Sequence, residues 1–105
     1  KKHNMESALN INFQNIIIYG SGQIGKEIIS KSRLFKSIIN DFDIIDSDVK
    51  KIGTEIFNKQ VKSPEILKKD DRKILIASAQ AYDEIFANII KLQGSSNNIL
   101  SKLII

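Results

Sequence analysis

The chain has 105 residues, a formal net charge of +4 and no cysteine, and its length suits one globular domain with a hydrophobic core. The missing thiols exclude a disulfide framework and a cysteine nucleophile, and they favour a cytoplasmic setting. No apolar run approaches the roughly 18 to 20 residues that span a bilayer, and the lysines are scattered along the chain, which excludes a membrane span and disfavours nucleic-acid binding.

The first segment, residues 1–14, is polar and weakly periodic, so we expect a tail or linker ahead of a single domain over residues 15–105. It contains His3, the only histidine, far from any acidic or nucleophilic partner, and we expect this side chain to be incidental. Because the chain opens on Lys1 and closes on the apolar residues Leu103–Ile105, we also expect it to be part of a longer protein.

The stretch around which the chain is organised is Asn15–Lys26, NIIIYGSGQIGK. Its apolar, β-branched residues Ile16–Tyr19 predict a strand buried on both faces. A G-x-G-x-x-G turn follows directly, and then an amphipathic pattern predicts a helix whose main stripe is Ile24, Ile28, Phe35 and Ile39. Strand, glycine turn and helix come in the order of a phosphate-binding βα unit.

Each glycine of the turn has its own predicted role. Gly20 allows a sharp turn off the strand, Gly22 lets a pyrophosphate approach the backbone, and Gly25 lets the helix pack closely on the strand. The free N–H groups at the start of the helix, together with its dipole, would receive the phosphate charge. This part of the predicted cofactor site comprises Gly20, Ser21, Gly22, Gln23, Ile24 and Gly25.

A second predicted strand, Phe42–Ile45, ends at an acidic residue, Asp46. It follows the third glycine at roughly the 20-residue offset at which a carboxylate meets ribose hydroxyls in dinucleotide folds. We therefore assign Asp46 and its neighbour Ser47 to the cofactor site. Asp46 and Asp48 could chelate a cation, but exposed acids at a strand end explain them equally well, and we expect no metal.

The next part of the chain is irregular from Ser47 to Gln60, with turn signals that predict a small hairpin anchored by Ile56 and Val61. A short strand at Val61 would lie near an edge of the sheet. A helix start is predicted at Ser63, whose hydroxyl can cap the first turn. Pro64 suits the first helical position because its φ is fixed, and the charge of Glu65 complements the helix dipole. That helix would bury Ile66 and Leu67 and end at Asp70–Asp71.

The last part of the chain repeats the pattern of strand and helix. Lys73–Ala77 predicts a buried strand, Ser78–Gln80 a loop, and the residues up to Gly94 a helix with one apolar face of Tyr82, Ile85, Phe86, Ile89 and Ile90. Asn97 and Asn98 would turn the chain into a final apolar segment. The alternation predicts an α/β fold, a Rossmann-like three-layer αβα sandwich with parallel strand order 3-2-1-4-5 and a crevice above Gly20 and Ser78.

Several segments together resemble the Rossmann-like domain of bacterial polysaccharide-biosynthesis enzymes, namely nucleoside-diphosphate-sugar epimerase/dehydratases, sugar methyltransferases and sugar acyltransferases. The resemblance extends from Asn15 to about Gly94 and rests on IIIYGSGQIGKEI, FDIIDSD, KKIGTEIFNKQV, SPEIL and KILIASAQAYDEI. It implies binding of NAD(P) or a nucleotide sugar. Asn58 and Asp43 stand where the family usually has glycine, so we expect the mouth of the crevice to differ at Asp43.

We assign Ser78 to the predicted cofactor site as its last residue. The sequence shows no set of catalytic residues beside this site. Tyr82 is followed four positions later by Phe86 instead of the lysine of a short-chain dehydrogenase, and Lys26 is the one side chain near the turn that could neutralise phosphate. We expect a non-catalytic accessory domain covalently linked to a sugar-processing catalytic domain. The alternatives are a regulatory nucleotide-sensing module that controls a partner domain and an S-adenosylmethionine-dependent methyltransferase fragment.

Overall fold

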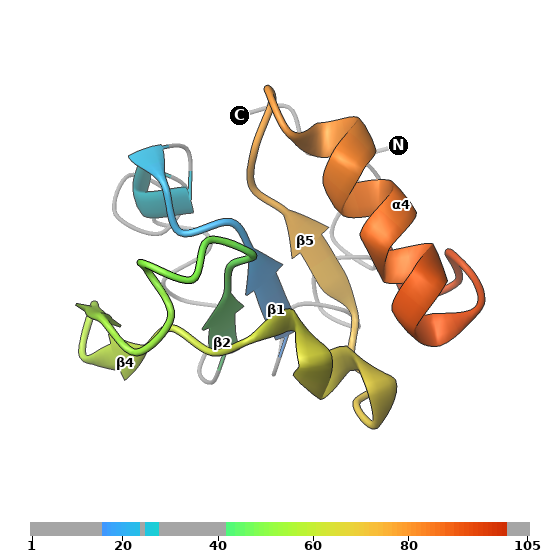
Figure 1. Cartoon of the computed structure of the whole chain (residues 1–105), viewed down its shortest axis with the longest axis horizontal. Helices are drawn as coiled ribbons and strands as arrows, with labels where there is room; N and C mark the ends of the chain where they lie inside the picture. The colour runs from blue at the N-terminus through green and yellow to red at the C-terminus, as the bar shows by residue number, and fades with distance from the viewer. Residues whose placement is uncertain (1–15, 24, 28–41, 101–105) are drawn as a thin grey trace, which may run out of the picture.

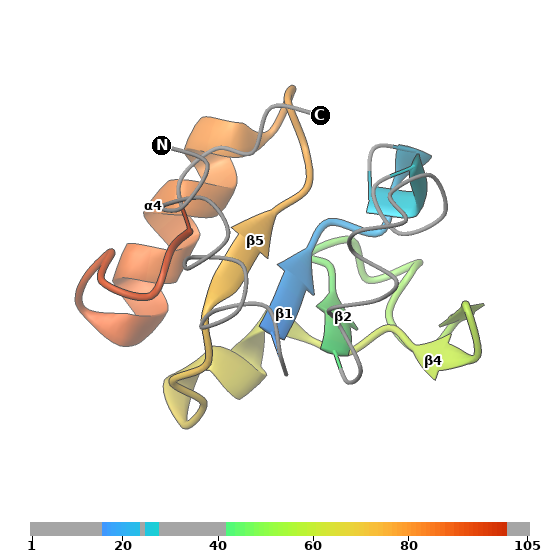
Figure 2. The same cartoon turned by 180° about the vertical axis from the view of Figure 1, so that it is seen from behind.

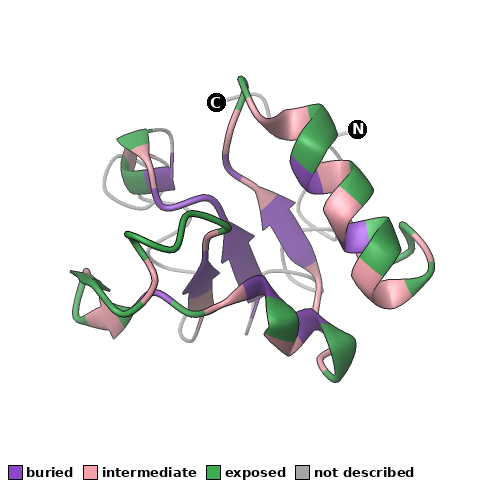
Figure 3. Ribbon diagram, in the orientation of Figure 1, coloured by how far each residue is buried: buried purple, intermediate pink, exposed green. Residues whose placement is uncertain are grey.

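The computed structural model describes residues 16–23, 25–27 and 42–100 of the chain, a mixed α/β structure built on a parallel sheet (Figure 1). The central strand β1 (Ile16–Tyr19) pairs in parallel with β2 (Phe42–Ile45) on one side and with β5 (Ile74–Ile76) on the other. All four residues of β1 are buried, as its continuous apolar run predicts (Figure 3). Three of the five predicted strands, those at Ile16–Tyr19, Phe42–Ile45 and Lys73–Ala77, are confirmed, the last as Ile74–Ile76, and so is the α/β class.

Two isolated parallel bridges continue the hydrogen bonding beyond the outer strands. Ile45 bridges to Lys62 at the edge of β2, and Ile74 bridges to Ile99 at the edge of β5. The Lys62 N–H donates to the Ile44 carbonyl at 2.8 Å, and the Leu100 N–H donates to the Ile74 carbonyl at 2.8 Å. The predicted strand at Val61 is thus reduced to a bridge at Lys62.

A small antiparallel hairpin, β3 (Glu55–Ile56) and β4 (Lys59–Gln60), projects beside β2. Its two turn residues have positive φ angles, +53° at Phe57 and +62° at Asn58, as a tight hairpin turn requires. The hairpin is as predicted, and Asn58, which stands where the resembled family usually has glycine, tolerates its left-handed conformation because asparagine adopts positive φ more readily than most residues. Phe57 adopts a conformation that bulky side chains seldom take, and its ring is left partly exposed.

The predicted helix start at Ser63 is correct, but the helix is shorter than expected. η1 (Pro64–Lys68) is a 3-10 helix in which the Ser63 hydroxyl accepts the Glu65 N–H at 3.2 Å and Leu67 is buried. It ends before Asp70, because the Asp70 carboxylate accepts hydrogen bonds from Arg72 and so stabilises a turn.

The long helix α4 (Tyr82–Gln93) lies on the same face of the sheet as η1 (Figure 1). It ends at Gly94, with φ +80°, whose N–H bonds to the Ile90 carbonyl, as the sequence predicts. Ile85 and Ile89, one helical turn apart, fill the core. The expected burial of Ile90 is wrong, because this side chain lies about 100° around the helix from Ile89 and is 39% exposed.

Some predictions fall on residues that lie outside the described ranges. The helix after the glycine turn is described only at Gln23 and 25–27, where the Lys26 N–H bonds to the Gly22 carbonyl at 3.1 Å. Its stripe of Ile24, Ile28, Phe35 and Ile39 lies outside them, as do the tail with His3 and the end of the last apolar segment. Within the described ranges, no helix is long and apolar enough to cross a membrane.

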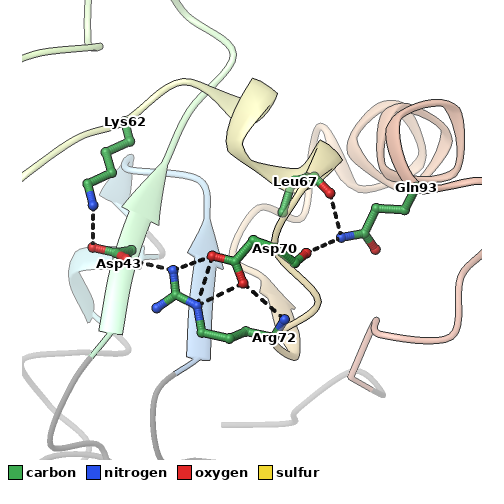
Figure 4. Close-up of polar contacts among 6 residues, drawn as sticks. All are labelled: Asp43, Lys62, Leu67, Asp70, Arg72 and Gln93. Carbon is green, nitrogen blue, oxygen red and sulfur yellow. Dashed lines mark hydrogen bonds and ion pairs between the residues drawn. The ribbon is translucent and has the colours of Figure 1, made fainter.

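A charged cluster holds the amino-terminal half of β2 to the segments that precede β5 (Figure 4). Arg72 lies between two carboxylates, with its Nη2 2.7 Å from Asp43 Oδ2 and 2.7 Å from Asp70 Oδ2, and Lys62 Nζ lies 3.1 Å from Asp43 Oδ1. The Gln93 side-chain amide of α4 donates to the carbonyls of Leu67 and Asp70. The cluster therefore joins β2, η1 and α4.

The ionised forms of the cluster are favoured. Burial raises the pKa of Asp43, but the hydrogen bonds and charges of Arg72 and Lys62 outweigh it and hold the pKa below the ordinary 3.8. The hydrogen bond from the Arg72 side chain likewise lowers the pKa of Asp70. The lowered pKa values of Asp43 and Asp70 mean that their ionised forms stabilise the fold at pH values above the ordinary pKa of an aspartate. This stabilisation is lost as the pH falls through the lowered pKa values.

Replacing Arg72 by methionine should lower the free energy of unfolding at pH 7 by about 1 to 3 kcal/mol, since two partly buried carboxylates lose their partner. Urea unfolding at pH 7 and at pH 3 would measure this, and the difference between wild type and variant should shrink at pH 3. Lys68→Met is the matched control, because the exposed Lys68–Glu65 pair should contribute little. Equal losses at both pH values would contradict the assignment.

Candidate functional site

A cleft of about 610 Å³ opens at the carboxyl ends of β1 and β5, where the glycine turn and the loop before α4 meet. Six of the nine predicted site residues line it: Gly20, Gly22, Gln23, Asp46, Ser47 and Ser78. Ser21 and Gly25 are buried beneath the turn, and Ile24 lies outside the described residues. The sequence analysis did not assign the other lining residues, which are Tyr19, Asp48, Lys51, Ala77, Ala79, Gln80, Ala81, Glu84 and Ile85.

The first and third glycines of the turn are required by close backbone packing. Gly20 has φ +122°, and a Cβ there would lie 2.9 Å from the Ala77 carbonyl oxygen. A Cβ at Gly25 would lie 2.4 Å from the Gly20 carbonyl oxygen, closer than atoms can approach. These contacts agree with the sharp turn predicted for Gly20 and the close packing predicted for Gly25.

The second glycine, Gly22, is different because it faces the cleft. Among the described residues, a Cβ built there would have one neighbour within 4 Å, the Lys51 ammonium nitrogen at 3.8 Å. No main-chain atom of the described residues beyond the turn itself crowds the backbone at Gly22. This is the geometry that the close approach of a phosphate group needs.

The Asp46 carboxylate ties the glycine turn to the end of β2. Its Oδ2 accepts the Ser21 N–H at 2.9 Å and the Ser21 hydroxyl at 2.6 Å, and its Oδ1 accepts the Asp48 N–H at 2.8 Å. Ser21, predicted to face a cofactor, is 4% exposed and directs its hydroxyl to Asp46. Because a carboxylate oxygen can accept two hydrogen bonds, Oδ1 retains capacity toward the cleft.

The environment of Asp46 keeps it ionised. Burial raises its pKa, but hydrogen bonds from the Ser21 side chain and from the backbone N–H groups of Asp48 and Ser21, with the charge of Lys51, bring the pKa below the ordinary value. An ionised acceptor beside the glycine turn is what recognition of a ribose diol requires. The position predicted for Asp46 thus carries suitable chemistry, although its first role is to brace the turn.

Two side chains that line the cleft, Tyr19 and Ser47, form a hydrogen-bonded chain with Asn88 of α4, which lies outside the cleft lining. The Tyr19 hydroxyl accepts a bond from Asn88 Nδ2 at 2.7 Å and lies 2.5 Å from Ser47 Oγ. Tyr19 is buried in the core, as the sequence predicts. Asn88 was missed, although a polar residue between Ile85 and Ile89 on the apolar face of α4 is a signal that could have revealed it.

The remaining predicted residue, Ser78, helps to begin α4, because its hydroxyl accepts the Ala81 N–H at 3.0 Å. Asp43, expected to alter the mouth of the crevice, does not line the cleft and instead bonds to Arg72 and Lys62. A second groove of about 550 Å³ adjoins the cleft along α4 and shares Ser47, Glu84 and Ile85 with it.

The polar groups that line the cleft can contact a ligand. Within the described ranges, the Ser47 and Ser78 hydroxyls are bonded to Tyr19 and to the Ala81 N–H, and neither is hydrogen-bonded to a general base. Among the described residues, no group of three or more His, Cys, Asp or Glu side chains is placed to hold a metal ion. Accessible backbone at Gly22, an ionised acceptor at Asp46 and a cation at Lys51 are the groups that could contact a ligand.

A pair of alanine substitutions distinguishes the two kinds of glycine. Gly25→Ala should lower the free energy of unfolding by about 1 to 3 kcal/mol, because the new methyl group would collide with the Gly20 carbonyl. Gly22→Ala should change it by less than about 0.5 to 1 kcal/mol, since the space there is open. Chemical denaturation measures both values, and equal losses would show that the described packing is incorrect.

The chain was compared with protein-family models, with curated proteins and with solved structures, and nothing in the three sets matches it. The resemblance to the Rossmann-like domain of polysaccharide-biosynthesis enzymes therefore stays a hypothesis that rests on the sequence segments that suggested it.

Proposed function

We propose that the cleft binds NAD(P) or a nucleotide sugar, with the pyrophosphate over the glycine turn and a ribose beside Asp46. The observation that carries this proposal is the open backbone at Gly22, in a turn fixed at the carboxyl end of the central parallel strand. Ligands of parallel α/β sheets bind outside the carboxyl ends of the strands. The site lies at the topological switch point, where the connections from two adjacent strands run to opposite sides of the sheet. β1 has that position, between β2 and β5.

We further propose that the sheet is the middle of a Rossmann-like three-layer sandwich with strand order 3-2-1-4-5. The parallel bridges at Lys62 and Ile99 support this, because they lie on the outer edges of β2 and β5, where the third and fifth strands would pair. Figure 2 shows β1 between these two strands. The location of α4 and η1 on one face leaves the opposite face for the helix that begins after Gly25.

In its biological setting, we propose a cytoplasmic accessory domain of a bacterial polysaccharide-biosynthesis enzyme, linked to a catalytic domain that performs the chemistry. The cleft supports this because it offers ligand contacts without an activated nucleophile or base. The two alternatives, a nucleotide-sensing regulatory module and a fragment of an S-adenosylmethionine-dependent methyltransferase, differ from it in ligand or in the effect on a partner.

The direct test is ligand-detected NMR of the full chain with NAD, NADP, UDP-sugars, AMP and S-adenosylmethionine. Gly22→Val should weaken binding of the ligand that the wild type prefers by far more than tenfold, because a branched side chain would occupy the position of the pyrophosphate. Gly22→Ala should weaken it less, and both variants should melt near the wild-type temperature. Unchanged affinity of Gly22→Val would contradict the site, and exclusive binding of S-adenosylmethionine would favour the methyltransferase alternative.

Within the panel, NAD or a nucleoside diphosphate should bind more tightly than NADP. The ionised Asp46 can accept hydrogen bonds from a ribose diol, whereas it would repel a 2′-phosphate. Side-by-side calorimetric titrations with NAD and NADP measure the preference. Tighter binding of NADP would mean either that Asp46 does not contact the ribose or that Lys50 or Lys51 offsets the charge of the 2′-phosphate.

A further inference from the structure

The cleft has an unfavourable charge for the ligands proposed above. Three acidic side chains line it, those of Asp46, Asp48 and Glu84, and within the described part of the chain Lys51 is the only basic side chain that lines it. A pyrophosphate group would enter this acidic surrounding with its own negative charge. Lys51 is therefore the side chain on which the electrostatic balance depends.

The location of Lys51 is suited to this task. Its ammonium nitrogen lies 3.8 Å from the point where a Cβ would stand at Gly22, so it projects over the open backbone of the glycine turn. The main chain beneath it is held by hydrogen bonds, from the Lys51 N–H to the Asp48 carbonyl at 2.9 Å and from the Thr54 hydroxyl to the Lys51 carbonyl at 2.7 Å.

From this geometry we propose that Lys51 donates charge-assisted hydrogen bonds to the pyrophosphate of the bound nucleotide, an inference that rests on the proposed function of the cleft. The loop after β2 then supplies a phosphate ligand from the side opposite the turn, in addition to the backbone N–H groups of the turn itself. Lys51 then adds to the preference for a nucleoside diphosphate over its parent nucleoside that the backbone N–H groups of the turn provide.

A purely structural role for Lys51 would have different consequences. As a counter-charge of Asp46 it would stabilise the turn and would affect phosphorylated and unphosphorylated ligands alike. Its neighbour Lys50 offers a matched control, because it is exposed, does not line the cleft, and contacts the same loop through its N–H to Asp48 Oδ1 at 2.9 Å.

The test compares Lys51→Gln, Lys51→Arg and Lys50→Gln in the full chain. Binding of NAD, UDP-glucose, adenosine and uridine is measured by NMR titration at low and at physiological salt, with thermal melting to confirm folding. Lys51→Gln should weaken the phosphorylated ligand that the wild type binds by about tenfold or more and reduce its salt dependence, while its parent nucleoside is unaffected. Lys51→Arg and Lys50→Gln should bind within about threefold of wild type.

The possible results separate the two levels of inference. If Lys51→Gln binds the phosphorylated ligand as well as Lys50→Gln does, Lys51 does not contact the pyrophosphate. If it weakens nucleoside and phosphorylated ligand equally, Lys51 has a structural role and the proposal is overturned. If the wild-type chain binds none of the four compounds, the proposed function itself fails, and the role of Lys51 fails with it.

Discussion

The Asp46 carboxylate is the constraint on which the rest of the cleft depends. It accepts hydrogen bonds from both the backbone and the side chain of Ser21 and from the backbone of Asp48, so one side chain joins β1, the glycine turn and the loop after β2. Since Gly20 and Gly25 already press the turn against Ala77 and against each other, its position is fixed from two sides. A turn held in this way can expose its backbone at Gly22 without collapsing onto the sheet.

The negative charge of Asp46 is unfavourable for a phosphate group bound in the same cleft. An ionised carboxylate next to a predicted phosphate position favours the ribose and disfavours the phosphate, and Asp48 and Glu84 add to the negative potential. The donors that bond to Asp46 from Ser21 and Asp48 are neutral, so they leave its charge in place. The compensation has to come from a cation, and the braced turn from Asp48 to Thr54 places Lys51 where its field acts on the same space.

Sequence patterns could predict the parts of this fold that rest on local rules. Runs of β-branched residues predict β1 and β5, the glycine spacing predicts the turn, and Gly94 predicts the end of α4. The misses arise where tertiary contacts decide. The exposure of Ile90 depends on which helical face meets the sheet, and Lys51 enters the cleft through a loop whose path no periodicity specifies. The early end of η1 is instead a local effect, because Asp70 and Arg72 are two positions apart in the chain.

Two aspartates on or next to β2 differ in how their charges are compensated. Asp43 is paired with the cations Arg72 and Lys62, so its charge is neutralised within the cluster that joins β2 to η1 and α4. Asp46, at the carboxyl end of the same strand, is bonded to neutral donors and keeps its charge at the wall of the cleft. In a parallel sheet, the loops that form ligand sites follow the carboxyl ends of the strands. Asp43, paired with cations, therefore stabilises the amino-terminal end of the sheet, whereas the charge of Asp46 faces the cleft at the carboxyl end.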